Sequence, residues 1–154
     1  ATLSGAYVRI LPVAHRNQAM PLESARARHD LLVENMAWNA RASDAFGRIL
    51  DLPVGWDTYG APRVSRDVAA NAYMLLKDIM RVRSTPFPHV VPTSEGGIQM
   101  EWHREDFDLE IEVGPDLAVF VYGSEGAPGT EFAGEPFEVE FRLAQALLKL
   151  SAMN

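Results

Sequence analysis

The chain has 154 residues, of which 47% are hydrophobic and 23% charged, a composition typical of a folded domain that excludes a wholly disordered chain. It has no cysteine, which excludes disulfides, thiolate zinc sites and cysteine nucleophiles. The net charge of −7 is uneven: residues 1–83 carry eleven Lys and Arg against eight Asp and Glu, whereas residues 84–154 carry three against thirteen. This asymmetry argues against direct nucleic-acid binding and permits an acidic surface that meets a basic protein.

A single cytoplasmic domain is expected. Residues 1–5 lack the basic segment and apolar run of a signal peptide, and no apolar run reaches the roughly 18 residues of a membrane span. The absence of cysteine also fits a reducing compartment. The length suits one domain over residues 1–154, with a helical half at about 22–83, a β-meander at about 90–122 and a C-terminal helix at about 138–152.

The first half of the chain predicts two helices. Apolar residues recur every three or four positions from about 22 to 50, until Pro53 ends the pattern. Ser65 is a favourable N-cap for a second helix, from about 66 to 82. Because the connection between the two helices is short, we expect them to pack side by side in opposite directions.

The middle of the chain predicts a β-hairpin. Residues 98–103 and residues 107–113 each alternate strictly between apolar and polar side chains, as in strands with one buried face. Glu105-Asp106 is the expected turn between them. That turn sets the register and pairs Trp102 with Leu109, both directed into the core.

A third strand is predicted at residues 117–122, which are apolar on both faces. Such a strand is usually covered on both sides. Its cover could come from the C-terminal helix, from another molecule or from residues 6–13, a short apolar segment that Pro12 restricts to a sheet edge. Residues 123–134 are rich in Gly and Pro and are expected to form a loop.

The end of the chain fits two structures. Residues 137–143 alternate as in a strand, whereas residues 144–150 are strong helix formers. We expect a helix from about Glu138, because Pro136 and the early glutamates suit a helix N-terminus. The predicted fold is therefore α+β: two N-terminal helices packed on an antiparallel β-meander of three or more strands, with a C-terminal helix.

The expected register gathers charged side chains on the outward face of the meander. Glu101 faces Glu110, and His103 faces Asp108. Neighbouring carboxylates can raise a pKa for acid–base chemistry or, with a histidine, hold a metal ion. A solvated or partner-facing surface is the preferred interpretation. The candidate partner-binding residues are Glu101, His103, Asp108, Glu110, Glu112, Phe120 and Tyr122.

A second candidate surface is the loop that carries Trp56, Asp57 and Tyr59. The two aromatics suit a binding platform. The preferred alternative is structural: they fill the gap between the helix ends and the sheet, while Asp57 caps backbone amides. The sequence contains no zinc-protease, P-loop or serine-hydrolase motif, so we assign no catalytic residue, metal ligand or cofactor.

Three segments resemble a family of small bacterial proteins for which no activity is established. They are residues 55–61 (GWDTYGA), residues 92–102 (PTSEGGIQMEW) and residues 107–111 (FDLEI). That family shows a W-D-x-Y-G-A loop before a helix, then P-T-x-x-G-G-x-x-L-E-W leading into a second acidic strand. The resemblance covers roughly residues 53–122. It implies only that the matching residues belong to one structural design, namely Trp56, Asp57, Tyr59, Gly97, Glu101 and Trp102.

Two functions of different classes are compatible with these patterns. The first is a non-enzymatic interaction protein, such as an inhibitor or antitoxin-like protein, that uses the acidic sheet face against a basic protein partner. One version is a phage-encoded inhibitor of a nucleic-acid-binding defence complex. The alternative is a small metal-dependent hydrolase that uses Glu101, His103, Asp108 and Glu110. The sequence favours the first and leaves a homo-oligomer open.

Overall fold

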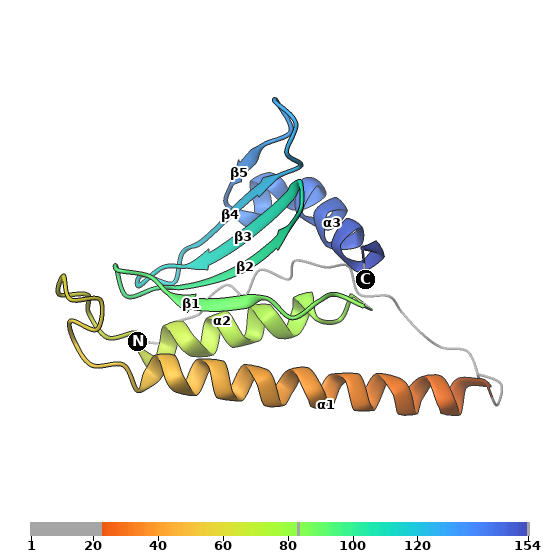
Figure 1. Ribbon diagram of the computed structural model, residues 1–154, viewed down its shortest axis with the longest axis horizontal. Helices are drawn as coiled ribbons and strands as arrows, with labels where there is room; N and C mark the ends of the chain where they lie inside the picture. Colours follow the sequence, from red (N-terminus) through yellow and green to blue (C-terminus); the bar gives the residue numbers. More distant parts are fainter. Residues whose placement is uncertain (1–22, 83, 154) are drawn as a thin grey trace, which may run out of the picture.

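The computed structural model describes residues 23–82 and 84–153, and for residues 23–35 it describes the backbone alone. Within these residues it confirms the predicted α+β class, with three helices and a five-stranded antiparallel sheet (Figure 1). The edge strand expected at residues 6–13 lies outside the described residues. In chain order the elements are α1 (Glu23–Leu50), α2 (Arg66–Ile79), β1 (His89–Pro92), β2 (Ile98–Arg104), β3 (Phe107–Val113), β4 (Val119–Ser124), β5 (Phe132–Gly134) and α3 (Pro136–Ala152).

The helices α1 and α2 lie side by side in opposite directions, as expected (Figure 1). Ser65 is the N-cap of α2, and its hydroxyl oxygen accepts a hydrogen bond from the Val68 N–H at 3.1 Å. Tyr73 of α2 makes a hydrogen bond and a ring contact to α1. Its hydroxyl donates to Asn39 Oδ1 of α1 at 2.7 Å, and its ring packs edge-on against Phe46, with 6.0 Å between ring centroids.

The strands follow one another across the sheet in chain order, and every neighbouring pair is antiparallel. The predicted register of the β2–β3 hairpin is confirmed, with Trp102 opposite Leu109 and Glu101 opposite Glu110. The edge strands β1 and β5 were not predicted as separate strands. They have four and three residues, too few to show an alternating pattern, and β1 ends at a proline.

The predictions for residues 117–134 were wrong in two respects. The strand begins at Val119, because Leu117 has a left-handed φ of 68° in the preceding turn, and it continues to Ser124. In addition, β5 lies within the segment expected to be a loop. On the inner side of β4 Val121 is fully buried, whereas Phe120 on the other side is 50% exposed. Of the three covers that the sequence left open, α3 packs on β4, residues 6–13 lie outside the described residues, and another molecule stays a prediction.

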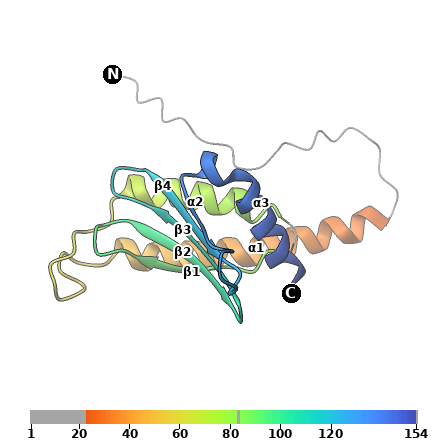
Figure 2. The ribbon, with the colours of Figure 1, turned by 90° about the horizontal axis from the view of Figure 1, so that it is seen from above.

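One face of the sheet is covered by helices (Figures 1 and 2). α2 packs on β2 and β3, α3 packs on β4 and β5, and α1 lies outside α2 and contacts β1. The buried apolar side chains of all three helices and of β2 to β4 form one continuous cluster. We call the sheet surface that faces this cluster the inner face. Among the described residues, no helix has the length and apolar character that a membrane crossing requires.

The C-terminal segment is a helix that starts at Pro136, two residues before the predicted start. The Glu138 carboxylate reaches back and accepts a hydrogen bond from the Glu135 N–H at 3.0 Å, which satisfies a donor that a helix start leaves without a partner. Val139, Leu143 and Leu147 then face the core. The strand-like alternation at residues 137–143 arises because the opposite side of the helix is also apolar.

Truncation of a side chain at the centre of the inner face is expected to lower the free energy of unfolding strongly. Leu109 is fully buried on β3, so Leu109→Ala is expected to lower the free energy of unfolding by about 2–5 kcal/mol. Met36→Ala is the matched control, because Met36 is an exposed helical residue, and it should change stability by less than about 0.5 kcal/mol. Urea unfolding monitored by circular dichroism measures both. Equal effects of the two substitutions would contradict the assignment of the core.

Candidate binding face of the sheet

The surface opposite the helices, which we call the outer face, is built from alternate residues of all five strands. No described helix packs on it (Figures 1 and 2). The register aligns its side chains in three rows across the sheet: Val91, Gln99, Glu112 and Phe120; His89, Glu101, Glu110, Tyr122 and Ala133; and His103, Asp108 and Ser124. All seven residues predicted to bind a partner therefore lie on one face.

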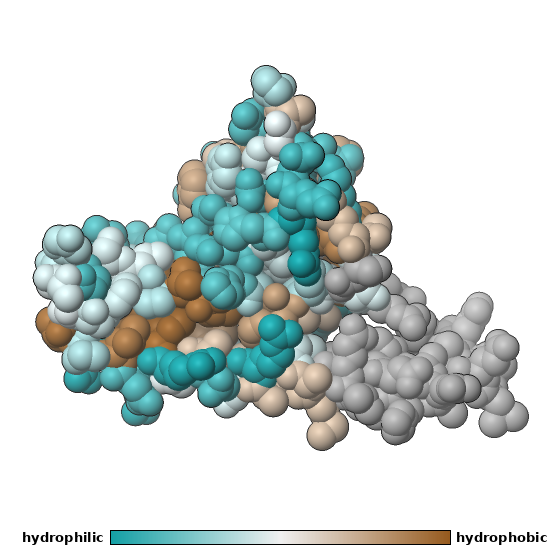
Figure 3. Space-filling model, viewed as in Figure 1, coloured by the Kyte–Doolittle hydropathy of each residue, from teal (hydrophilic) through white to brown (hydrophobic). Residues whose placement is uncertain are grey.

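The outer face is acidic. It carries four carboxylates, and no Lys or Arg stands among the rows just defined. Arg104 at the end of β2 lies opposite Phe107 and so belongs to the inner-face series. The space-filling view shows hydrophilic surface over the sheet and a hydrophobic strip at the level of β1, between the sheet and α1 (Figure 3). The surface is thus strongly negative with apolar area beside it.

His103 bridges two carboxylates on this face. Its Nδ1 lies 2.7 Å from Asp108 Oδ1, and its Nε2 lies 3.3 Å from Glu101 Oε2. The hydrogen bond to Asp108 raises the pKa of His103 above its ordinary value of 6.5, and Glu101 acts in the same direction against the opposing effect of partial burial. When protonated, the ring can donate to both carboxylates at once.

The unfavourable Glu101–Glu110 pair is confirmed by the register, but each carboxylate has its own hydrogen-bond partner. Gln99 Nε2 donates to Glu110 Oε2 at 2.8 Å, and Glu101 faces His103. The two negative charges are therefore turned toward different neighbours. This arrangement offsets part of the destabilisation that like charges cause on a sheet.

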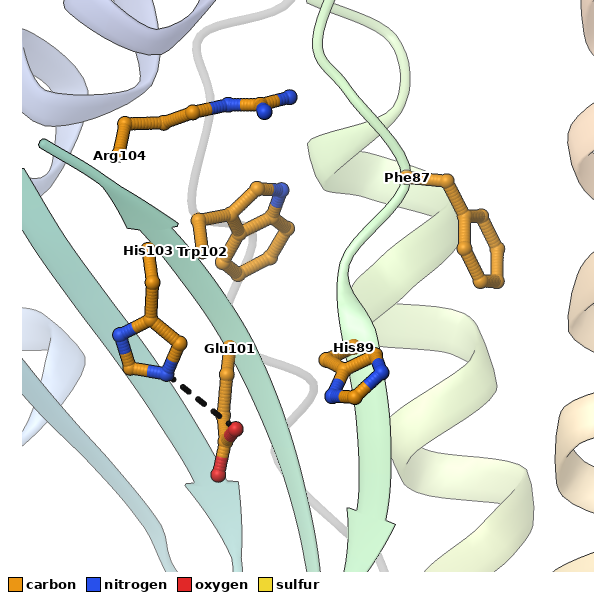
Figure 4. Close-up of a pocket in the computed structure, with 6 residues that line it drawn as sticks. All are labelled: Phe87, His89, Glu101, Trp102, His103 and Arg104. Carbon is orange, nitrogen blue, oxygen red and sulfur yellow. Dashed lines mark hydrogen bonds and ion pairs between the residues drawn. The ribbon is translucent and has the colours of Figure 1, made fainter.

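A pocket of about 270 Å³ lies beside the outer face, where β1 and β2 meet (Figure 4). Trp102 stands between Arg104 and Glu101, and its Nε1 donates to the Pro86 carbonyl at 2.7 Å, which holds the indole in place. The sequence alone gave no role to His89. The β1–β2 register places it opposite Glu101, and recognition of β1 as a strand would have shown this. The full lining is Phe87, His89, Glu101, Trp102, His103 and Arg104.

The geometry gives no support to a metal centre. Among the residues whose side chains are described, 36–82 and 84–153, no group of three or more His, Asp or Glu side chains is arranged to hold a metal ion. His103, the one imidazole bonded to two carboxylates on this face, places its two nitrogens against different carboxylates instead of leaving one nitrogen for a metal. What this cluster can do is present fixed negative charge and change its own charge with pH.

The three residues of the second candidate surface differ in their environments. Asp57 Oδ1 accepts hydrogen bonds from the Tyr59 and Ala61 N–H groups, each at 2.9 Å, and the bond from Ala61 contributes most to lowering the pKa of Asp57. The predicted capping role of Asp57 is thus confirmed. Tyr59 is 93% exposed and fills no gap, so that expectation was wrong for it. Trp56 is half-buried, and its Nε1 has no hydrogen-bond partner.

The segments that carry the family resemblance are close to one another in the fold. Gly96 has a left-handed φ of 89°, and a Cβ atom placed there would lie 3.0 Å from Pro62. The turn before β2 is therefore next to the end of the loop that carries Trp56, Asp57 and Tyr59. Comparisons with models of protein families, with curated proteins and with solved structures found no match. Membership of the family stays a prediction.

The His103 contacts predict a pH dependence of stability. Because folding raises the pKa of His103, its stabilising contribution is fully present below the unfolded pKa and is lost as the pH rises through the folded value. Wild type should therefore lose more unfolding free energy than His103→Gln between about pH 6 and about pH 9. An NMR titration of the imidazole should also show a lower pKa in Asp108→Asn. An unchanged titration in that variant would contradict the bridge.

Proposed function

We propose that this chain is a non-enzymatic interaction protein whose outer face binds a basic surface of another protein. The observation that carries the proposal is the concentration of four carboxylates on one sheet face that no described helix covers and that holds no Lys or Arg. A sheet spaces such charges on a grid of about 5 Å between strands and about 7 Å along them. A field of this kind steers a basic partner toward the face and fixes its orientation.

Two aromatic residues supply apolar contact area beside the charges. Phe120 is half exposed and lies opposite Glu112, and Tyr122 is half-buried opposite Glu110. Exposed aromatics among charged groups are typical of protein interfaces, where they provide most of the binding energy. A basic partner that normally binds nucleic acid suits this face, because its surface is already built for an array of negative charges. Inhibition of such a partner is the version of the proposal that we favour.

A salt-dependent capture experiment with matched variants tests the proposal. The face variant combines Glu110→Gln, Glu112→Gln and Phe120→Ala. The control combines Glu95→Gln, Glu140→Gln and Met36→Ala, so it has the same net charge and also loses one exposed apolar side chain away from both candidate surfaces. Wild type and control should recover the same partner from lysate of the source cells, whereas the face variant should recover about tenfold less or nothing.

Binding should also weaken steeply as salt is added, because the charges are exposed. Retention of the partner by the face variant, or recovery that does not depend on salt, would contradict the proposal. Calorimetry with Mg²⁺, Mn²⁺ and Zn²⁺ tests the alternative, a metal-dependent hydrolase. Heat of binding with wild type that disappears in Glu101→Gln would favour that alternative over the interaction protein.

A further inference from the structure

A row of large apolar side chains is exposed along α3, on the side of the helix that faces away from the sheet. Phe137 is 82% exposed, Phe141 73% and Leu148 65%, with the half-buried Ala144 between them. At 100° per residue these four positions fall within an arc of about 60°. We call them the α3 row. It does not belong to the core, because the core-facing residues of α3 occupy the opposite side of the helix.

We propose that the α3 row binds the α3 row of a second copy of this chain, with the two helices antiparallel. The first reason is that the row is complementary to itself. Phe137 and Leu148 are equally far from the midpoint of the row, and so are Phe141 and Ala144. An antiparallel pair centred there places Phe141 of each copy against the small Ala144 of the other, so large side chains meet small ones.

The second reason is the distribution of charge beside the row. Glu138 lies in the first turn of α3 and Lys149 in the last, and both flank the same side of the row. An antiparallel two-fold pair brings Glu138 of one copy alongside Lys149 of the other, whereas a parallel two-fold pair would place these flanks on opposite sides of the interface and would not form this pairing. Antiparallel packing also aligns the two helix dipoles favourably.

Arg142 is the third charged residue on the flank that carries Glu138 and Lys149, and it does not oppose the pairing. Arg142 donates from its Nη2 to the Thr130 carbonyl at 2.7 Å, and its guanidinium lies 5.1 Å from the centroid of the Phe132 ring. These contacts turn Arg142 toward β5 and its preceding loop. Its charge is therefore directed away from the partner helix. Lys149 pairs with Glu125 and lies 5.7 Å from the centroid of the Phe107 ring, yet it is 42% exposed and its ammonium has three donors, which leaves room for a second carboxylate.

The dimer would leave the outer faces of both copies accessible. α3 packs on the inner face of the sheet, so a contact through the far side of α3 places the two outer faces on opposite sides of the assembly. The inference does not depend on the function of the outer face. If that face does bind a partner, the dimer presents two such faces and gains avidity for a partner that is itself repeated.

Sedimentation of the full chain tests the dimer. Wild type should show a concentration-dependent monomer–dimer equilibrium, and Phe141→Glu should raise the dimer dissociation constant by about a hundredfold, because the substitution occurs twice in a symmetric dimer. The control is Met36→Glu, which adds the same charge at an exposed apolar residue of α1. It should leave the equilibrium unchanged. A wild type that is monomeric up to its solubility limit, or a dimer that Phe141→Glu does not weaken, overturns the proposal.

Distances between spin labels test the antiparallel geometry. The chain has no cysteine, so Gln145→Cys and Ala152→Cys each provide a single labelling site. With a rise of 1.5 Å per residue, the antiparallel pair separates the two labels along the helix axis by about 8 Å at residue 145 and about 28 Å at residue 152. Equal separations at the two sites would indicate parallel helices and overturn the arrangement. Circular dichroism of each variant verifies that α3 is retained.

Discussion

Burial of the inner face of β2 and β3 against α2 is the constraint on which the rest of the structure depends. Side chains alternate between the two faces of a strand, so once Trp102 and Leu109 enter the core, Glu101 and Glu110 must point outward. A shift of the register by one residue would bury the carboxylates and expose the apolar side chains, at a cost far larger than the repulsion between two exposed glutamates. The like-charge pair is therefore a consequence of the core.

The same hairpin shows how much the sequence could predict. Seven residues of strict alternation in β3, with a short turn before it, determined the register and thereby the positions of the charged residues on the face. The edges of the sheet could not be predicted in this way. β5 has three residues within a segment rich in Gly and Pro, and its pairing with β4 depends on contacts distant in the sequence. His89 was missed for the same reason, since only the position of β1 places it opposite Glu101.

The apolar pattern of β4 has a different explanation. A run that is apolar on both faces normally indicates a strand buried on both sides, yet Phe120 is half exposed on the outer face. The alternation at residues 137–143 was ambiguous for a related reason, because α3 is apolar both toward the core and away from it. Both elements carry more apolar side chains than the described fold buries. Such surplus marks the places where a second molecule would be accommodated.

The two surfaces that carry this surplus differ in their chemistry and in their position. On the outer face, Phe120 stands among carboxylates, so the contact it favours is with a charged surface of opposite sign, and its strength falls with salt. On α3, the row that contains Phe137 and Phe141 carries no charge itself, although Glu138 and Lys149 flank it, so the contact it favours is mainly apolar and depends less on salt. The sheet lies between them, with β4 contributing Phe120 outward and Val121 inward toward α3. Because the β4 backbone and the α3 core contacts separate the two surfaces, the proposed binding at one would leave the other free, so the proposed basic partner and a second copy of the chain would not compete for the same residues.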